Sequence, residues 1–300
     1  MATALVDLLS PATLSRIENY ALLAKVAVEG YMSGLHRSFS HGQGSEFLQY
    51  RSYAPGDDLK YVDWKVFSRS DKFYTKVFQE ETNMNCYLVL DASASMDYQG
   101  ERGVCTKWRY AAMVAACLAY LASRQGDNVG LCIYNDNLVE MIEARQRQGQ
   151  LQRILTALAR HKPKNRAEHG YSWNYLTGRL RNRGMVMFVS DFLEAEETLP
   201  PILKRIRFAR HECVGIQVLD PDERDLPFDR STEFIDPEDG RRILTNPEKV
   251  RRHYMEKMDD FQERLSVSMA RAHVEFLPLN SSDSLARSLS AYLHKREALQ

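Results

Sequence analysis

The stretch Cys86-Tyr-Leu-Val-Leu-Asp91-Ala-Ser93-Ala-Ser95 is an apolar run that ends in one carboxylate and two evenly spaced hydroxyls. An apolar run without polar alternation is typical of a strand buried on both faces, as in a parallel sheet covered by helices. In such sheets, ligands bind beyond the carboxyl ends of the strands. We therefore expect Asp91, Ser93 and Ser95 to lie where a binding site forms.

From Asn85 onward, apolar runs alternate with amphipathic segments, which predicts an α/β fold with a mostly parallel, Rossmann-like sheet flanked by helices. A second buried strand, expected at 185–189, also ends in polar oxygens, those of Ser190 and Asp191. A proline-glycine turn predicts a hairpin insertion near 231–245. A helix is expected at 173–181 and an acidic loop at 220–225.

The first part of the chain reads as an extension of one helix and short strands. Ser10 as N-cap and Pro11 at the first helical position predict an amphipathic helix that runs to about Glu29. Short strands are expected at 47–53 and 73–78, with a short helix between them that Asp57 caps. We therefore divide the chain into an extension, residues 1–84, and an α/β domain, residues 85–300.

Composition narrows the class of protein. Forty basic and forty acidic side chains cancel, so no global charge favours nucleic acid or an anionic membrane. The five cysteines are scattered without a C-x-x-C pair, which is typical of reduced core residues. No signal-peptide pattern opens the chain, and the longest apolar run, residues 110–122, is shorter than the roughly 20 residues that a membrane span needs. We expect a cytoplasmic protein with no membrane span and no nucleic-acid partner.

The oxygens at the two strand ends indicate a divalent cation. Asp91, Ser93, Ser95 and Asp191 offer hard oxygen ligands and no nitrogen or sulfur, which favours magnesium, with calcium or manganese as alternatives. Magnesium takes about six ligands and keeps several waters, so one position stays open. A glutamate or aspartate of a partner protein can complete the coordination there, which makes binding metal-dependent.

Enzymatic interpretations of the same residues are less favoured. A haloacid-dehalogenase-type phosphatase needs a carboxylate two residues after its nucleophile, and that position is Ser93. The chain contains no G-x-S-x-G elbow and no G-x-x-x-x-G-K-[ST] phosphate loop. We expect no enzyme. Two alternatives stay open: a metal-assisted phosphatase using Asp91 and Asp191, and a scaffold whose metal motif is vestigial.

The pattern D-x-S-x-S at residues 91–95, followed by Ser190-Asp191, resembles the metal-ion-dependent adhesion site of von Willebrand factor type A domains. Upstream, the stretches 46–58, 63–65 and 80–83 resemble the domain-of-unknown-function 58 family, in its short soluble form. The resemblance implies a von Willebrand A-like domain and no enzymatic reaction. It also implies a protein partner, either a MoxR-type AAA+ ATPase or that ATPase's client, in assembly or stress response.

One ligand of the adhesion-type site is missing. Such sites usually add a threonine from a loop between the second and fourth strands. The corresponding residues 165–173 contain no threonine, and Ser172 or Glu168 would have to take its place. The spacing does not decide between them.

Overall fold

The computed structural model describes residues 10–38, 49–52, 67, 73–77, 84–180, 183–193, 195 and 198–297. The chain forms two compact units, one of residues 1–34 and 83–300 and the other of residues 35–82. In the smaller unit, β1 (Gln49–Ser52) pairs antiparallel with β2 (Tyr74–Val77), within the two strands predicted there. The predicted helix at 58–66 and its cap Asp57 lie outside the described residues.

The larger unit is built on a six-stranded sheet in the order β10-β7-β6-β3-β4-β5. Only the edge strand β5 is antiparallel to its neighbour, so the predicted α/β class with a mostly parallel sheet is confirmed. The strands are β3 (Asn85–Asp91), β4 (Asn128–Tyr134), β5 (Leu138–Arg145), β6 (Gly184–Ser190), β7 (Glu212–Leu219) and β10 (Glu275–Asn280).

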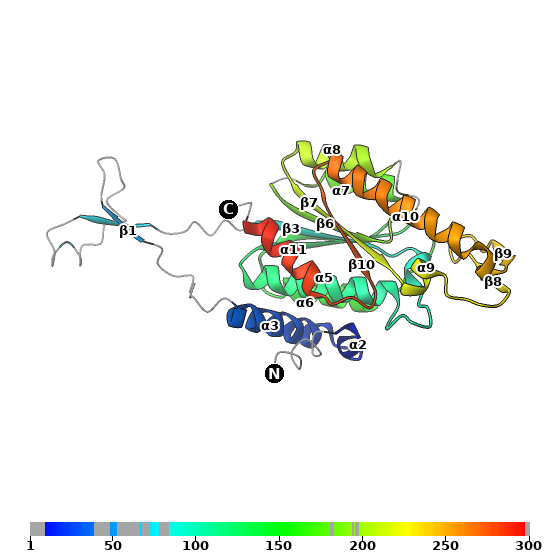
Figure 1. The fold of residues 1–300 in the computed structure, drawn as a ribbon. Coiled ribbons are helices and arrows are strands. Elements are labelled where there is room, and N and C mark those ends of the chain that lie inside the picture. Colours follow the sequence, from blue (N-terminus) through cyan, green and yellow to red (C-terminus); the bar gives the residue numbers. More distant parts are fainter. Residues whose placement is uncertain are drawn as a thin grey trace. The chain divides into compact units, whose positions relative to one another are not determined.

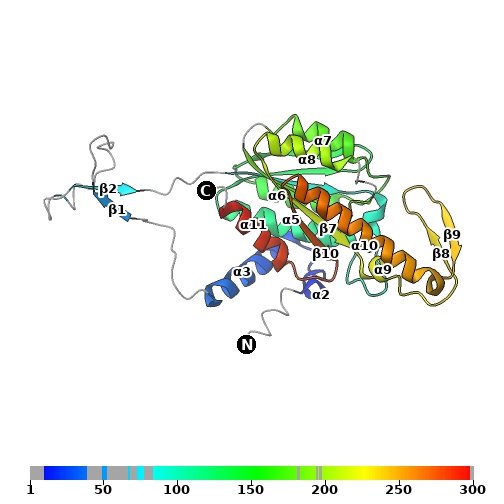
Figure 2. The ribbon, with the colours of Figure 1, turned by 45° about the horizontal axis from the view of Figure 1, so that its top comes forward.

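Helices cover both faces of this sheet, as Figures 1 and 2 show. One face carries α3, α5, α6 and α11, and the other carries α7, α8 and α10. Their bounds are α3 (Tyr20–Ser38), α5 (Lys107–Arg124), α6 (Gln150–Arg160), α7 (His169–Thr177), α8 (Leu199–Phe208), α10 (Pro247–Arg271) and α11 (Ala286–Glu297). Among the described residues, no helix is long and apolar enough to cross a membrane.

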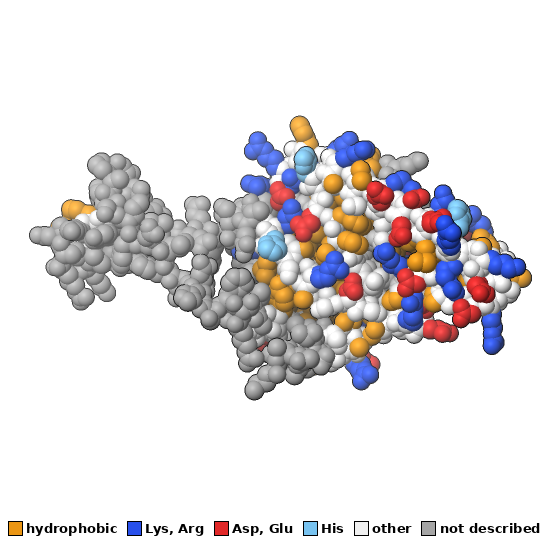
Figure 3. All heavy atoms as spheres, viewed as in Figure 1, with side chains coloured by type: hydrophobic (Ala, Val, Ile, Leu, Met, Phe, Trp, Pro, Cys, Tyr) orange, Lys and Arg blue, Asp and Glu red, His pale blue; other side chains and the backbone are white. Residues whose placement is uncertain are grey.

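Charged side chains of both signs are interspersed over the face of the larger unit seen in Figure 3. Beneath the surface, the residues of β3 alternate between two hydrophobic cores. Leu88 and Leu90 join the core on the α5 face, whereas Tyr87 and Val89 join the core on the α8 face. This alternation explains why the strand has no polar side chain other than Tyr87 between Asn85 and Asp91, since both of its faces are covered.

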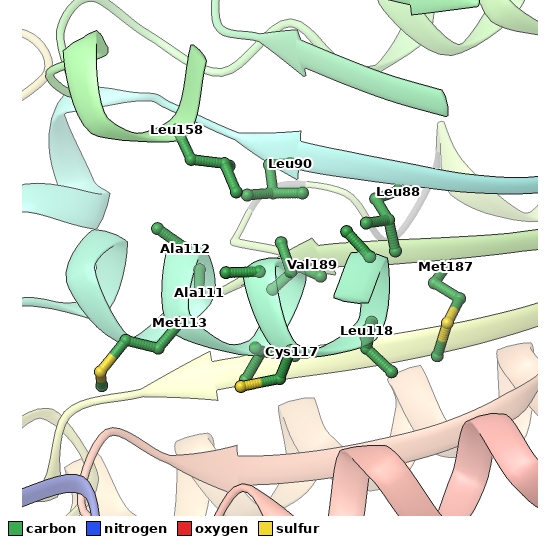
Figure 4. Packing of buried hydrophobic residues seen from close by; sticks show 14 of the residues in the cluster. Leu88, Leu90, Ala111, Ala112, Met113, Cys117, Leu118, Leu158, Met187 and Val189 are labelled. Atoms are coloured by element: carbon green, nitrogen blue, oxygen red, sulfur yellow. The ribbon is translucent and has the colours of Figure 1, made fainter. Parts of the chain in front are cut away.

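Helix α5 packs directly on the strands that lead to the polar edge. Thr106 caps it by accepting a hydrogen bond from the Arg109 backbone N–H at 3.1 Å. Small residues such as Ala111 and Ala112 are fully buried and let the helix lie close to Leu88, as Figure 4 shows. This close packing fixes the start of α5 beside the carboxyl ends of the central strands.

The N-terminal segment differs from the prediction of one helix. It forms α2 (Pro11–Leu14) and α3, because the Asn19 side chain accepts hydrogen bonds from the backbone of Ala21 at 2.8 Å and Leu22 at 3.2 Å and starts a new helix. Leu14 and Leu23 are fully buried in the core of the larger unit. Residues 1–34 therefore group with the α/β domain, whereas the predicted division placed them in the extension.

Two further elements near the polar edge differ from prediction. The acidic segment expected to be a loop contains a short helix, α9 (Pro221–Asp225), which Asp220 and Glu223 start through a reciprocal capping box. Helix α7 begins at His169, four residues before its predicted start. The predicted hairpin is present as β8 (Thr232–Ile235) paired with β9 (Arg242–Thr245).

Candidate functional site

The candidate site lies where the chain reverses its direction of travel across the sheet. From β3 the chain crosses through α5 to β4 on one side, and it later returns to place β6 on the other side of β3. Such a topological switch point opens a crevice at the carboxyl ends of the two central strands. Asp91 ends β3 and Ser190 ends β6, so the two predicted strand ends meet here.

The structure brings the four predicted ligands together. The Oγ atoms of Ser93 and Ser95 are 3.0 Å apart, and Ser95 Oγ donates a hydrogen bond to Asp191 Oδ2 at 2.9 Å. Asp91 Oδ1 accepts from the Ser93 backbone N–H at 2.8 Å, which turns the chain at the end of β3. Asp91, Ser93 and Asp191 are buried, and Ser95 is half-buried at the rim.

Ser190 connects the two strand ends directly. Its hydroxyl donates to Asp91 Oδ2 at 2.7 Å and accepts from the Phe192 backbone N–H at 2.9 Å. Both carboxylate oxygens of Asp91 therefore have a hydrogen-bond donor, and the side chain has a fixed orientation. Burial raises the pKa of Asp91, and the nearby charge of Asp191 adds to this, while His169 opposes it.

A buried lysine that the sequence analysis did not single out completes the site. Lys107, the first residue of α5, places its Nζ 2.9 Å from Asp191 Oδ2 and 2.6 Å from Glu223 Oε1. Burial alone would lower the pKa of Lys107, but the charges of Asp191 and Glu223 raise it above its ordinary value. Its sequence signal is a lysine at the start of a largely apolar helix.

The lysine sets the charge of Asp191. Burial alone would raise the pKa of Asp191, but the charge and hydrogen bond of Lys107 outweigh it and hold that pKa below its usual range. Asp191 Oδ1 also accepts from the Leu193 backbone N–H at 3.1 Å. Asp191 is therefore the fixed carboxylate of the site, and its ionised form is stabilised on both oxygens.

Glu223 reaches the site from α9, the short helix that follows β7. The Asp220 backbone N–H donates to Glu223 Oε2 at 3.0 Å, which leaves Oε1 for Lys107. Burial raises the pKa of Glu223, and Lys107 opposes this. Two carboxyls, those of Asp191 and Glu223, thus pair with the one ammonium of Lys107, and the buried carboxyl of Asp91 lies near Asp191.

Neither proposed substitute for the missing threonine joins this group. The 164–165 backbone contacts the D-x-S-x-S loop, since Lys164 N donates to Ala92 O at 2.9 Å. Yet Glu168 is exposed, and the buried Ser172 Oγ has no hydrogen-bond partner among the residues that the structure describes. In the described part of the chain, neither side chain has a hydrogen bond to the four predicted ligands.

Among the described residues, no group of three or more His, Cys, Asp and Glu side chains is arranged to hold a metal ion. The candidate site is of another kind, because half of its predicted ligands are serine hydroxyls. Hydroxyls and carboxylates together suit a hard cation such as Mg²⁺. The donor set at the strand ends therefore fits such an ion without a cluster of acidic residues.

Comparison with known proteins places the chain in a family. A model described as "Protein of unknown function DUF58" matches residues 49–264. The chain belongs to this family. It is similar to uncharacterized proteins of Mycobacterium tuberculosis (strain ATCC 25618 / H37Rv) and Mycobacterium bovis, each 30% identical over 237 residues, which cover 78% of this chain and 74% of the relative.

Solved structures share the architecture of this DUF58 protein. The conserved hypothetical protein BatB from Bacteroides thetaiotaomicron aligns with a TM-score of 0.50 at 14% identity, over 71% of this chain and 98% of BatB. The SpRpn10 VWA domain aligns with a TM-score of 0.43 at 11% identity, over 70% and 95% of the two chains. The six-stranded sheet flanked by helices is von Willebrand A-like. The upstream stretches 46–58, 63–65 and 80–83 that suggested the family lie almost entirely outside the described residues.

Proposed function

We propose that this chain is a non-enzymatic protein-binding module that presents a divalent cation to its partner. Asp91, Ser93, Ser95 and Asp191 hold the ion, directly or through water. Magnesium suits these ligands best, and calcium and manganese are alternatives. The observation that carries the proposal is the convergence of two serine hydroxyls and a carboxylate oxygen at the switch point.

The oxygen spacing fits the proposed ion. Ligands at neighbouring corners of an octahedron lie about 3.0 Å apart when the metal–oxygen distance is about 2.1 Å, the value for magnesium. Ser93 Oγ and Ser95 Oγ are 3.0 Å apart, and Ser95 Oγ is 2.9 Å from Asp191 Oδ2. Each of these two pairs of oxygens therefore has the spacing of neighbouring magnesium ligands.

The charge of the buried group also favours a dication. Ionised Asp91, Asp191 and Glu223 carry three negative charges and Lys107 carries one positive charge, which leaves two negative charges. Buried charges are costly unless a partner neutralises them. A divalent cation offsets this excess of negative charge, and it also stabilises the ionised form of Asp91.

The open coordination position suits an acidic side chain of a partner. We assign that partner to the class that the family resemblance indicates, a MoxR-type AAA+ ATPase or its client, acting in the cytoplasm in assembly or stress response. Charges of both signs alternate over the face seen in Figure 3, which supports a protein partner more than nucleic acid.

The same geometry argues against catalysis by Asp91. Both of its carboxylate oxygens accept hydrogen bonds, and its side chain is buried. A nucleophile needs an accessible oxygen lone pair, and a partner base or acid two residues on is absent because Ser93 stands there. The arrangement therefore suits a positioned ligand. A metal-assisted phosphatase and a scaffold with a vestigial site are the competing functions.

The proposal is tested by measuring the binding of this chain to the MoxR-type AAA+ ATPase of its native cell. We expect the affinity measured in Mg²⁺ to fall by about tenfold or more in chelator and in Ser95→Ala, because each removes a determinant of the ion. Asp97→Asn alters an exposed carboxylate two residues away and serves as the matched control. Equal binding in chelator would remove the ion from the mechanism, and turnover of a chromogenic phosphate ester that Asp91→Asn abolishes would favour the phosphatase.

A further inference from the structure

An acidic side chain from the β8–β9 hairpin reaches the candidate site. The carboxylate of Glu238, in the turn of this hairpin, lies close to the Ser95 hydroxyl and to the Ala167 backbone N–H. Its Oε2 lies 3.9 Å from Arg166 Nε, and the side chain is only 16% exposed. Ser95 and Glu238 are 143 positions apart in the sequence, so this contact is produced by the fold alone.

The turn that presents Glu238 is internally braced. The Glu238 backbone N–H donates to Asp236 Oδ1 at 2.8 Å, and Gly240 N donates to Asp236 O at 2.9 Å. Gly240 adopts a φ of 75°, which is the left-handed region that glycine enters without strain. The hairpin, visible beside α9 in Figure 2, therefore holds its tip in one conformation.

The strands of this hairpin are far more exposed than its tip carboxylate. Ile235, Ile243 and Leu244 are 52%, 65% and 74% exposed, whereas the glutamate in the turn is largely covered. A charged turn residue is normally solvated. Here the contacts with Ser95 and with residues 166–167 account for its burial, so the tip is anchored at the site.

Ser95 has more oxygen neighbours than its single proton can satisfy. Its Oγ lies beside Ser93 Oγ, Asp191 Oδ2 and the Glu238 carboxylate. A hydroxyl donates one hydrogen bond, so it serves one of the two carboxylates at a time. A cation among these oxygens removes the conflict, because every one of them can then act as a ligand.

We propose that Glu238 is an acidic ligand of the ion supplied by this chain itself. In the free chain, Glu238 occupies the open coordination position. A partner's carboxylate takes that position when the partner displaces the hairpin tip. This inference rests on the proposed ion site. It accounts for the missing threonine, since an additional oxygen comes from the hairpin insertion and neither Ser172 nor Glu168 has to supply it. The hairpin then competes with the partner's carboxylate for the ion, so the partner must bind the ion more strongly than Glu238 does.

Magnesium titration calorimetry on the full chain tests the inference. We expect Glu238→Gln to weaken magnesium binding by about tenfold, as loss of a charged group next to a metal does. The matched control is Glu233→Gln on the same hairpin, whose carboxylate is 48% exposed and pairs with Arg242. Such an exposed pair contributes little, so we expect the control to bind within about twofold of the wild type.

Hydrogen–deuterium exchange of residues 232–245 gives a second readout that does not depend on affinity. Saturating magnesium should slow exchange of this segment in the wild type and leave it unchanged in Glu238→Gln. Wild-type affinity in Glu238→Gln, with binding lost in Ser95→Ala, would overturn the role of Glu238 while the ion site stands. A wild-type chain that binds no magnesium would overturn both.

Discussion

Lys107 is the residue on which the candidate site depends most strongly for stability. Its ammonium is fully buried and lies between the carboxylates of Asp191 and Glu223. Removing one partner of a buried ion pair is costly, because the remaining charges keep their desolvation penalty without the compensating attraction. The lysine therefore orients Asp191, and its positive charge offsets the repulsion between the carboxylates at the strand ends.

We expect Lys107→Met to lower the free energy of unfolding by about 3 to 5 kcal/mol. Urea denaturation at pH 8 in chelator measures it, since an added cation would compensate for the lost charge. Lys204→Met, at an exposed position of α8, is the control and should change the value by less than about 0.5 kcal/mol. Equal midpoints for the two variants would show that the buried pairing is not a stabilising feature.

His211 provides a pH dependence that is independent of the ion site. It is buried, its Nδ1 has no hydrogen-bond partner within the described part of the chain, and burial lowers its pKa. In the unfolded chain its pKa is about 6.5, so below that pH the unfolded state binds a proton that the folded state does not. Stability is therefore complete above about pH 6.5 and falls as the pH drops toward the lower folded pKa.

Comparing the stability of the wild type with that of His211→Gln isolates the pH dependence that is due to His211. Between about pH 6.5 and 5.5 the wild type should lose up to about 1.4 kcal/mol of unfolding free energy relative to the variant. Chemical denaturation across this range measures the difference, with exposed His253→Gln as control. Stability profiles of wild type and His211→Gln that stay parallel from pH 8 to 5.5 would contradict the assignment.

At the scale of elements, the site requires β3 and β6 to pair closely along their whole length. Gly184 starts β6 opposite Asn85, where a Cβ atom would lie 2.2 Å from the Asn85 carbonyl oxygen. The neighbour is backbone, so it cannot move aside as a flexible side chain can. The absence of a side chain at Gly184 therefore allows the strand register that brings Asp91 and Ser190 together.

We expect Gly184→Ala to cost about 1 to 3 kcal/mol of unfolding free energy through overpacking. Gly178→Ala is the matched control, because its added Cβ would meet its nearest neighbour at an ordinary 3.6 Å and its φ of −67° suits alanine. Thermal denaturation of both variants decides the point. A Gly184→Ala variant as stable as Gly178→Ala would mean that the strands can separate slightly without penalty.

The sequence predicted the strands and their polar ends well, because both signals are local. An apolar run that ends at Asp91 predicts a buried strand, and the hydroxyls of residues 93 and 95 follow within the next four positions. Boundaries set by side-chain capping were harder to predict. Asn19 starts α3 and Asp220 starts α9 through hydrogen bonds that compete with loop conformations.

Residues that join the site from distant positions in the sequence have no local sequence pattern that marks them. Lys107 meets Asp191 across 84 positions, and Glu238 meets Ser95 only because the hairpin folds back on the strand ends. A lone lysine at a helix start and a glutamate in a turn normally lie in solvent. Their roles follow from tertiary packing, which residue spacing along one chain does not encode.

At the scale of the whole molecule, helix α3 belongs to the folding unit of the α/β domain. Leu23 is fully buried in the core shared with α5, whereas its neighbour Leu22 is 53% exposed. We expect Leu23→Ala to lower the unfolding free energy by about 2 to 5 kcal/mol, and Leu22→Ala to cost far less, since it leaves no cavity. Urea denaturation followed by circular dichroism measures both.

The contrast between the two leucines tests whether the domain includes the N-terminal helices. If α3 were a separate extension, Leu23→Ala would leave the main unfolding transition unchanged or split it in two. A single transition that shifts for Leu23→Ala places residues 1–34 in the same cooperative unit as residues 83–300, as their contacts indicate.

The central claim is that the switch point of this von Willebrand A-like domain binds one divalent cation. Titration calorimetry of magnesium into the purified chain, with Ser95→Ala and exposed Asp97→Asn measured in parallel, tests it most directly. We expect one magnesium per wild-type chain, unchanged binding in Asp97→Asn, and loss of about tenfold or more in affinity in Ser95→Ala. Absence of binding to the wild type, or equal binding by wild type and Ser95→Ala, would contradict it.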